Sequence, residues 1–467
     1  MQKTVFIKTF GCQMNERDSE IMFQALSSMG YSESADMESA DLVILNTCSI
    51  RAKAEQKVMS LLGLLRKIKQ DRKEMQICVA GCVAQQEGEK LLERMPHVDL
   101  VIGTQNIYAI GELLEQVKRG RGLVAVAMTE GYEIPRFLPQ TGSEAGDDLH
   151  SQRQPLVFQQ FVTIMQGCNN FCAYCVVPYT RGREVSRKVH DIVDEVDKLV
   201  QRGVKEITLL GQNVNSYGRT NRVADGGLPY SFADLLHRVA AVPGLARLRF
   251  TTSNPKDLSD ELMCCFREIE VLCPQFHLPV QAGSDSVLQR MNRKYSVNQY
   301  LELVSRLRTY RPDIALSTDV IVGFPGETEE DFQGTMDLLE QVRYHGSFSF
   351  KYSDRPGTRA STFEDKVPEE IKSERLMRFQ TRQNEISLAR NREYLNQIKT
   401  VLIEEVHSEA AKGRTDTNHI VHIPEAARIN PGEFHQVRIG HAGHHSLRGN
   451  LILTSMAGPD RLSHNET

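Results

Sequence analysis

Three cysteines within eight residues constrain the fold of this chain more than any other feature of its sequence. Cys168, Cys172 and Cys175 stand in the stretch GCNNFCAYC, in a C-x3-C-x2-C pattern. The stretch directly follows a run typical of a β-strand, residues 158–165. Three thiolates at this spacing can hold an iron–sulfur cube and leave its fourth iron open to a small chelating molecule. A zinc knuckle without a nearby fourth ligand is the alternative, and the position after a strand disfavours it.

Strand-like runs alternate with helical patterns over most of the chain, which is typical of α/β proteins with parallel sheets. Residues 1–119 predict an open parallel-sheet α/β domain, and residues 154–386 predict a partial (β/α)6 barrel with functional residues at its C-terminal strand ends. A polar stretch rich in Gly, Pro and acidic residues predicts a linker at 120–153. Short strands with turns predict a small β-barrel at 389–457. The expected strands are 4–10, 41–46, 75–81 and 98–103, then 158–165, 206–211, 246–251, 275–280, 314–323 and 347–353.

Charge and hydropathy narrow the class of protein. Lys and Arg number 56 against 60 Asp and Glu, a net charge of -4, which argues against a protein that coats nucleic acid through bulk charge. Local basic patches still suffice to hold phosphates. We find no apolar run long enough for a membrane span and no signal peptide, and we expect a cytoplasmic protein. In that compartment the ten cysteines favour metal binding or catalysis over disulfides.

A second set of cysteines lies in the N-terminal domain. Cys12, Cys48 and Cys82, in TFGCQMN, LNTCS and AGCVAQ, each follow a predicted strand. Because the carboxyl ends of parallel strands share one edge of a sheet, we expect these thiols to meet and form a second three-thiolate site with an open iron. Cys78 competes with Cys82, but it lies inside its strand and should pack in the sheet. We expect ordinary buried or half-buried thiols at Cys264, Cys265 and Cys273.

The first triad, in this position, resembles the radical S-adenosylmethionine superfamily. The resemblance implies that the open iron chelates S-adenosylmethionine, and that an electron from the cluster releases a 5′-deoxyadenosyl radical that abstracts hydrogen from an unreactive C–H bond. It implies that Tyr174 packs beside the adenine, although a plain core aromatic is an alternative. The other implied cofactor contacts, for which ordinary turn geometry is the alternative, are Gly211, Gln212 and Asn213 at the methionine part, Gln281 and Ser284 at another strand end, and Gly323 at the adenine and ribose.

The two cysteine sites and the C-terminal barrel together resemble the methylthiotransferase family over nearly the whole chain. The resemblance implies two 4Fe-4S clusters, one S-adenosylmethionine that methylates a sulfur on the N-terminal cluster, and a second that generates the radical. It implies an RNA-binding TRAM domain at the C-terminus. The stretches GCNNFCAYCVVPYTRGREVSR and HLPVQAGSDSVLQRMNRKYS resemble the branch that inserts methylthio at C2 of an isopentenylated adenosine beside the tRNA anticodon. The implied partners are tRNA and a flavodoxin-type reductant, and we expect a monomer.

Two further features bear on RNA binding. Arg181 and Arg183 follow the cysteine loop, and we expect them to contact RNA phosphate or to hold the loop. The C-terminal domain is unusually rich in histidine, which weakens the expected grip on RNA at neutral pH because most histidines are then uncharged. A histidine metal site is a less favoured alternative. The histidines are His407, His419, His422, His435, His441, His444 and His445.

Rival functions stay open at the level of sequence. The nearest is methylthiolation of another substrate, either threonylcarbamoyladenosine in tRNA or an aspartate of a ribosomal protein. A different class is an iron–sulfur electron carrier or an RNA-binding scaffold with a structural metal. The predicted partial barrel argues against a carrier, which has no use for a cavity of substrate size.

Overall fold

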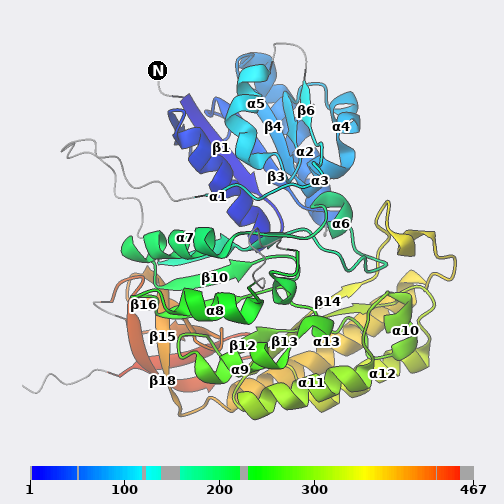
Figure 1. Cartoon of the computed structure of the whole chain (residues 1–467), viewed down its shortest axis with the longest axis vertical. Helices are drawn as coiled ribbons and strands as arrows, with labels where there is room; N and C mark the ends of the chain where they lie inside the picture. Colours follow the sequence, from blue (N-terminus) through cyan, green and yellow to red (C-terminus); the bar gives the residue numbers. More distant parts are fainter. Residues whose placement is uncertain are drawn as a thin grey trace, which may run out of the picture. The chain divides into compact units, whose positions relative to one another are not determined.

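The computed structural model describes residues 3–49, 52–117, 122–137, 158–220, 230–426 and 429–452 (Figure 1). The chain divides into two compact units, Met1–Gln380 and Thr381–Thr467. The first unit holds an N-terminal α/β sheet and a half-open α/β barrel, and the second holds a small closed β-barrel, so the predicted fold class is confirmed. Residues 138–153 of the predicted linker lie outside the described residues.

The N-terminal part is a six-stranded sheet in which every pair of neighbouring strands is parallel. The four predicted strands are present, and two three-residue edge strands join them. One of these, β6, lies within the stretch predicted as a linker, because a Leu-Val-Ala run extends the sheet beyond β5. The strand order is β2 (Tyr31–Glu33), β1 (Lys3–Thr9), β3 (Leu42–Thr47), β4 (Gln76–Gly81), β5 (Leu100–Ile102) and β6 (Leu123–Ala125).

Helices cover both faces of this sheet, as the alternating pattern predicts (Figure 1). Residues such as Ile21 and Leu26 of α1 and Ile110 of α5 pack in the core on one face, and Leu62 of α2 and Leu91 of α4 pack on the other. β3 between the two cores is buried along its whole length. The helices are α1 (Gln13–Ser27) and α5 (Ile110–Gln116) on the first face, and α2 (Ala52–Asp71), α3 (Cys82–Glu87) and α4 (Glu89–Arg94) on the second.

The central part contains the six parallel strands of the predicted partial barrel. They form two three-stranded sheets in the orders β11-β10-β7 and β12-β13-β14, and a bridge between Leu248 and Leu272 links the two. The strands are β7 (Gln159–Thr163), β10 (Glu206–Leu210), β11 (Arg247–Phe250), β12 (Gln275–His277), β13 (Ala315–Val322) and β14 (Gly346–Lys351). The helices around them include α7 (Val189–Gln201), α8 (Phe232–Ala240), α9 (Asp260–Glu268), α11 (Val297–Tyr310) and α12 (Glu329–Val342).

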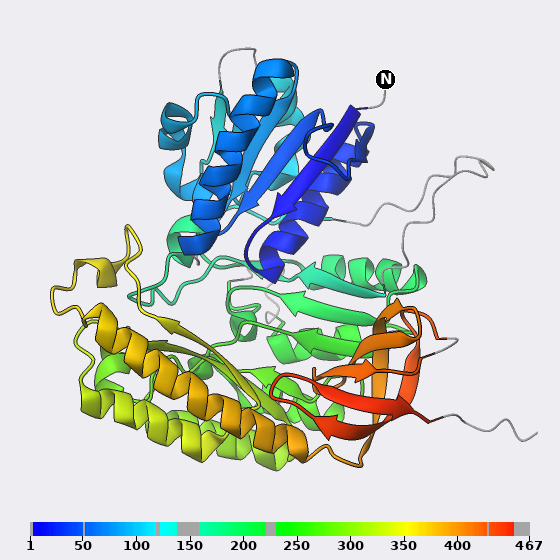
Figure 2. The same ribbon diagram turned by 180° about the vertical axis from the view of Figure 1, so that it is seen from behind.

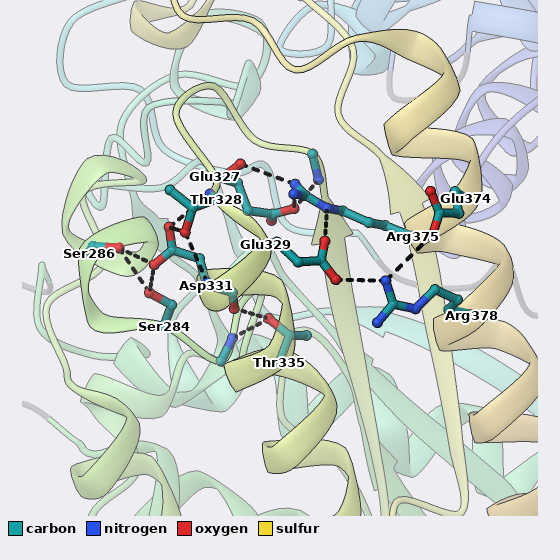
Figure 3. A network of polar contacts seen from close by, with 12 residues as sticks. Ser284, Ser286, Glu327, Thr328, Glu329, Asp331, Thr335, Glu374, Arg375 and Arg378 are labelled. Carbon is teal, nitrogen blue, oxygen red and sulfur yellow. Dashed lines mark hydrogen bonds and ion pairs between the residues drawn. The ribbon is translucent and has the colours of Figure 1, made fainter.

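A polar network ties the turn after β13 to α13 (Glu369–Arg392) (Figure 3). Buried Arg375 donates to the Glu327 carboxylate at 2.8 Å, and Arg378 donates to Glu329 at 2.7 Å. Burial raises the pKa of Glu327 to about 7, against the opposing effects of its hydrogen bond from the Gly323 N–H and of Arg375. Thr328 and Asp331 cap the start of α12 reciprocally, which fixes where that helix begins.

The second unit contains a closed barrel in the order β15-β16-β17-β19-β18 (Figure 2, orange to red). Its core is aliphatic and includes Val401, Val421, Val437 and Leu447. The histidine-rich segment thus folds as the predicted barrel. Within the described residues, no helix is long and apolar enough to cross a membrane. The strands are β15 (Ile398–His407), β16 (Ala410–Thr415), β17 (Ile420–Ile423), β18 (Phe434–Ala442) and β19 (Leu447–Leu451).

Candidate functional site

The N-terminal cysteines lie at the carboxyl ends of three neighbouring strands, as the sequence predicts. Cys12 follows β1 and precedes α1, Cys48 follows β3, and Cys82 is the first residue of α3 after β4. Gly11 approaches Cys48 so closely that a Cβ on Gly11 would lie 2.3 Å from the Cys48 Cβ. A hydrogen bond with Cys48 lowers the pKa of Cys12 to about 6, against the opposing effect of burial. The three thiols therefore share one edge of the sheet.

Asn15 on the first turn of α1 organises this edge. Its Nδ2 donates to the carbonyl oxygens of Phe10 and Thr47, both at 2.8 Å, and these carbonyls precede Cys12 and Cys48. The Cys12 Sγ lies 3.9 Å from the Asn15 Oδ1. One fully buried amide thus fixes two of the cysteine-bearing loops.

Thr47 fixes the third loop. Its Oγ1 donates to the Ala80 carbonyl at 2.6 Å and accepts from the Val83 N–H at 3.2 Å, so it brackets Cys82. Gly81 has φ +90°, and a Cβ there would lie 2.4 Å from the backbone carbonyl oxygen of Thr47. Glycine is therefore required before Cys82. The sequence reasoning missed Asn15 and Thr47, although both stand in the quoted cysteine stretches.

Cys78 and the remaining cysteines lie where they were expected. Cys78 is inside β4, fully buried in the core beneath α1, and burial raises the pKa of its thiol. Cys265 and Cys273 are buried and Cys264 is half-buried on or near α9. None of the ten cysteines forms a disulfide.

The second triad lies on a loop that starts at the two-residue strand β8 (Met165–Gln166). Gly167, just before Cys168, has φ +78°, and a Cβ there would lie 2.1 Å from the Arg183 carbonyl oxygen. The Gly167 N–H donates to the Gln212 Oε1 at 2.6 Å. Burial raises the pKa of Cys168 to about 11 and that of Cys175 to about 12. The loop is therefore pinned at its start against the end of β10.

Arg293 lies against this triad, and the sequence reasoning did not identify it. Its Nη1 is 3.3 Å from the Cys172 Sγ, its Nε donates to the Tyr295 hydroxyl at 2.8 Å, and its Nη2 donates to the Pro279 carbonyl at 3.1 Å. Burial raises the pKa of Tyr174, and the Arg293 charge opposes that rise. Arg293 therefore places a partly buried positive charge beside a cysteine and an aromatic ring.

Of the predicted cofactor contacts at the end of β10, Gly211 and Asn213 are buried and Gln212 is half-buried, and the end of β11 adds another polar group. Gln212 holds the cysteine loop as described, and Gly211 packs on Met165. Asn213 donates to Asp257 at 2.8 Å, while its buried Oδ1 has no hydrogen-bond partner among the residues that the structure describes. The same holds for the Ser253 Oγ after β11 and for the Gln166 Nε2. Such buried polar atoms at strand ends fit a polar cofactor with amino, carboxylate and hydroxyl groups.

The other three predicted cofactor contacts, Gln281, Ser284 and Gly323, interact with neighbouring residues of the barrel and of α12 and α13. Gln281 is buried with φ +76° at a bridge to Val320. Ser284 donates to the Asp331 carboxylate at 2.5 Å, in the network that caps α12 (Figure 3). Gly323 donates its N–H to Glu327 at 2.8 Å, and its Cβ position is filled by Lys372.

The two arginines after the second triad differ in environment. Arg181 is buried and donates to Asp18 at 2.6 Å, so its side chain is not accessible to RNA phosphate, and of its two expected roles the structure fits only that of holding the loop. Arg183 is exposed, with its guanidinium 5.1 Å from the Phe171 ring centroid. Only Arg183 stays available as a phosphate contact.

The outer face of the C-terminal barrel carries a row of basic side chains. Strand register places Lys412 of β16 beside His422 of β17, His422 beside Arg448 of β19, and Arg448 beside His441 of β18. Lys412 is partly exposed and the other three are exposed, while the strand neighbours of Lys412, His422 and Arg448 are buried. In contrast, His419 packs on Tyr394, with 4.7 Å between the two ring centroids. Burial lowers the pKa of His419 to about 4.

The donor chemistry fits two iron–sulfur cubes. Each site offers three free thiols, at three strand ends in the N-terminal sheet and on one loop in the central part, and each thiolate of such a cluster binds a different iron, so the sulfurs need not converge on one point. In the part of the chain that the structure describes, no group of three or more His, Cys, Asp or Glu is gathered to hold a metal ion. That finding applies to the barrel histidines as well.

Three family models match successive parts of the chain. The uncharacterized protein family UPF0004 matches residues 4–103, the radical SAM superfamily matches residues 162–339, and the TRAM domain matches residues 392–452. Two relatives carry the name tRNA-2-methylthio-N(6)-dimethylallyladenosine synthase. The protein from Desulfotalea psychrophila is 60% identical over 97% of this chain and 99% of its own length. The protein from Syntrophobacter fumaroxidans is 48% identical over 96% and 95%.

Among solved structures, the radical S-adenosylmethionine methyltransferase TsrM from Kitasatospora setae is similar in fold. Its complex with tryptophan and a SAM analogue covers 77% of this chain and 75% of that chain, with a TM-score of 0.54 and 16% identity. Its complex with cobalamin and a [4Fe-4S] cluster has a TM-score of 0.52 and 14% identity, and it covers 77% of this chain and 74% of that chain. At these identities the likeness shows the fold alone.

Proposed function

The chain belongs to the family of tRNA-2-methylthio-N(6)-dimethylallyladenosine synthases, and we propose that its six strand-end cysteines hold the two clusters of this reaction. The protein is a radical S-adenosylmethionine methylthiotransferase that modifies isopentenylated adenosine in tRNA. The names of its relatives favour this substrate over threonylcarbamoyladenosine or a ribosomal protein. The single observation that carries the proposed ligand set is that Cys12, Cys48 and Cys82 lie at the carboxyl ends of neighbouring parallel strands, while Cys168, Cys172 and Cys175 share one loop beyond the carboxyl end of β7.

The protein's own residues prepare the site. Cys168, Cys172 and Cys175 would hold one 4Fe-4S cluster, and Cys12, Cys48 and Cys82 would hold the other. When bound, the clusters and S-adenosylmethionine supply the electron, the radical and the methyl group of the reaction. Arg293 beside Cys172 places a positive charge next to the first cluster. Asn213 and Ser253, whose buried oxygens lack a partner among the described residues, are suited to orient S-adenosylmethionine, with Tyr174 beside it.

The C-terminal barrel is the proposed tRNA contact. A TRAM domain and the names of the relatives support tRNA as the partner. The row of Lys412, which also pairs with Glu405 at 2.7 Å, and the exposed His422, Arg448 and His441 is suited to phosphates, because such contacts come mostly from exposed basic side chains. We also propose a flavodoxin-type electron donor, which single-turnover reduction with purified flavodoxin would check. We propose a monomeric state as well, which light scattering would check.

The ligand set is tested by separating radical generation from sulfur insertion. Replacing Cys168, Cys172 or Cys175 with Ala should abolish reductive cleavage of S-adenosylmethionine. Replacing any of the three N-terminal cysteines should preserve cleavage, stop methylthiolation and lower iron by about four atoms per chain, the content of one cube. Production of 5′-deoxyadenosine, nucleoside mass analysis of tRNA and iron content are the three measurements.

Cys78→Ala is the matched control for the N-terminal set. Cys78 lies on the same strand as the Cys82 loop but packs in the core, so this variant should keep its iron. Loss of iron in Cys78→Ala together with full iron in Cys82→Ala would reverse the ligand choice. Full methylthiotransferase activity in all N-terminal variants would contradict the two-cluster assignment.

A further inference from the structure

Arg181 belongs to the central part of the chain but lies at the N-terminal cysteine site. It follows the short helix α6 (Val177–Thr180), six positions after Cys175. The segment docks on the N-terminal sheet, because the Thr104 hydroxyl, two residues after β5, donates to the Thr180 carbonyl at 2.6 Å. The chain that carries one triad therefore extends directly to the residues around the other.

Of the two terminal nitrogens of the Arg181 guanidinium, Nη2 donates hydrogen bonds to oxygen acceptors of the described residues, and Nη1 does not. Its Nη2 donates to the Asp18 carboxylate at 2.6 Å and to the Asn15 Oδ1 at 2.9 Å, and its side chain is 4% exposed. Its Nη1 is buried and has no hydrogen-bond partner among the described residues. A buried donor without an acceptor is costly, and on a charged group the cost is larger, so a partner of negative charge is expected there.

Arg181 lies against the N-terminal cysteines. The charges of Cys82 and Cys12 act on Arg181, after that of Asp18, and Arg181 in turn acts on both thiols, on Cys82 through its charge and through a side-chain hydrogen bond. Asn15 completes the connection, since it accepts from Arg181 and also lies against the Cys12 sulfur. The nearest competing anion is Asp18, which is already paired with Nη2.

We propose that Arg181 is a positioning residue that presents its Nη1 and its positive charge to the N-terminal cluster and thereby sets the reduction potential of that cluster. The inference rests on the proposed ligand role of Cys12, Cys48 and Cys82. A cluster gains negative charge when it takes up an electron, and a buried cation beside its sulfurs stabilises the reduced form. Removal of the guanidinium therefore lowers the potential.

The test is a reductive titration of the full chain with Cys168, Cys172 and Cys175 all replaced by Ala, so that only the N-terminal cluster is reconstituted. Dithionite with redox mediators sets the potential, and electron paramagnetic resonance measures the reduced cluster. In this background Arg181→Met should lower the ratio of reduced to oxidised cluster at least tenfold at the parent's midpoint, which corresponds to a shift of about 59 mV for one electron. Arg183→Met, an exposed arginine on the same loop, is the matched control and should not shift.

Asp18→Asn covers the case in which Arg181→Met fails to assemble the cluster. Removing the carboxylate frees the guanidinium from its counter-ion, so the potential should rise. An unchanged potential in Arg181→Met with full iron content overturns the inference, and so does an unchanged or lowered potential in Asp18→Asn. If the parent with three alanines assembles no cluster at all, the proposed N-terminal ligand set itself is wrong, and the inference falls with it.

Discussion

Asn15 is the single residue whose side chain contacts most parts of the N-terminal site. Asn15→Ala would leave the Phe10 and Thr47 carbonyls without their side-chain donor, and each buried carbonyl that loses its partner costs about 1–3 kcal/mol. We expect the free energy of unfolding to fall by about 3 kcal/mol and iron at the N-terminal site to be lost. Denaturant unfolding of the apoprotein and iron analysis check this.

The matched control is Asn106→Ala, which removes an amide that donates to the Ala127 carbonyl at an exposed position. We expect a change within about 0.5 kcal/mol there, because water replaces the lost partner. Equal losses in the two variants would contradict the special role of Asn15.

His419 gives the C-terminal barrel a dependence on pH. Burial lowers its pKa from 6.5 to about 4, so the unfolded chain binds a proton more readily than the folded barrel. The stability that neutral His419 contributes is fully present above pH 6.5 and is lost as the pH falls toward 4, by up to about 3 kcal/mol. Hydrogen exchange in β16 and β17, corrected for intrinsic rates, should show less protection at pH 5 than at pH 7. His419→Gln should reduce that difference, and an equal difference would exclude His419 as its source.

The positions of the cysteines in the fold could be predicted from the sequence, and the residues that support them could not. A triad such as Cys168, Cys172 and Cys175 is visible because its spacing is local and thiols are rare. Asn15 and Arg293 were missed because their roles depend on groups that are far away in the chain, such as the Thr47 carbonyl and the Cys172 sulfur. Arg181 was noticed, but the sequence could not show that its partner is Asp18.

At the scale of elements, a buried ion network joins α1 to α7. Glu195 of α7 is fully buried and pairs with Arg17 of α1 and with Arg187, whose Nη1 lies 2.7 Å from the carboxylate. Removing one partner of such a network leaves uncompensated buried charge, which costs about 3–5 kcal/mol. We therefore expect Glu195→Gln to lower the free energy of unfolding by that amount, measured by denaturant titration.

Asp194→Asn is the control on the same helix. Asp194 is the preceding residue, its side chain is 46% exposed, and it pairs with Arg136 in solvent. An exposed ion pair contributes little, so we expect a change within about 1 kcal/mol. If the two variants lose equal stability, the buried network does not hold these elements together.

The elements themselves followed largely from the sequence. All ten strands expected in the N-terminal sheet and the partial barrel are present, because alternation of apolar runs with helical periodicity is a local signal. β2 and β6 were missed, since each has three residues and lies at a sheet edge, where tertiary pairing and not pattern decides. The helical segment between β4 and β5 is interrupted at Gly88, which separates α3 from α4.

In the whole molecule, the cysteine sites are proposed to hold the clusters, and the C-terminal barrel is proposed to contact tRNA. All six proposed ligands lie in the unit Met1–Gln380, and the exposed basic row lies in the unit Thr381–Thr467. α13 continues to Arg392, and Tyr394 already belongs to the barrel core, so the natural point for truncation is after Arg392. The boundary predicted from the sequence, at 386–389, lies within α13, between the division after Gln380 and the end of the helix.

Truncation after Arg392 should leave reductive cleavage of S-adenosylmethionine intact and weaken tRNA binding by about tenfold or more at 0.1 M salt. The reason is that phosphate contacts from exposed cations dominate affinity, and each one lost lowers the slope of affinity against salt by about one. Arg448→Ala in the full chain should show part of this effect, since Arg448 is central in the basic row. Arg202→Ala, an exposed arginine at the end of α7, is the control and should bind like the wild type. If the truncated chain binds tRNA with unchanged affinity and salt slope, the RNA contacts lie in the first unit, and Arg183 becomes the next residue to replace.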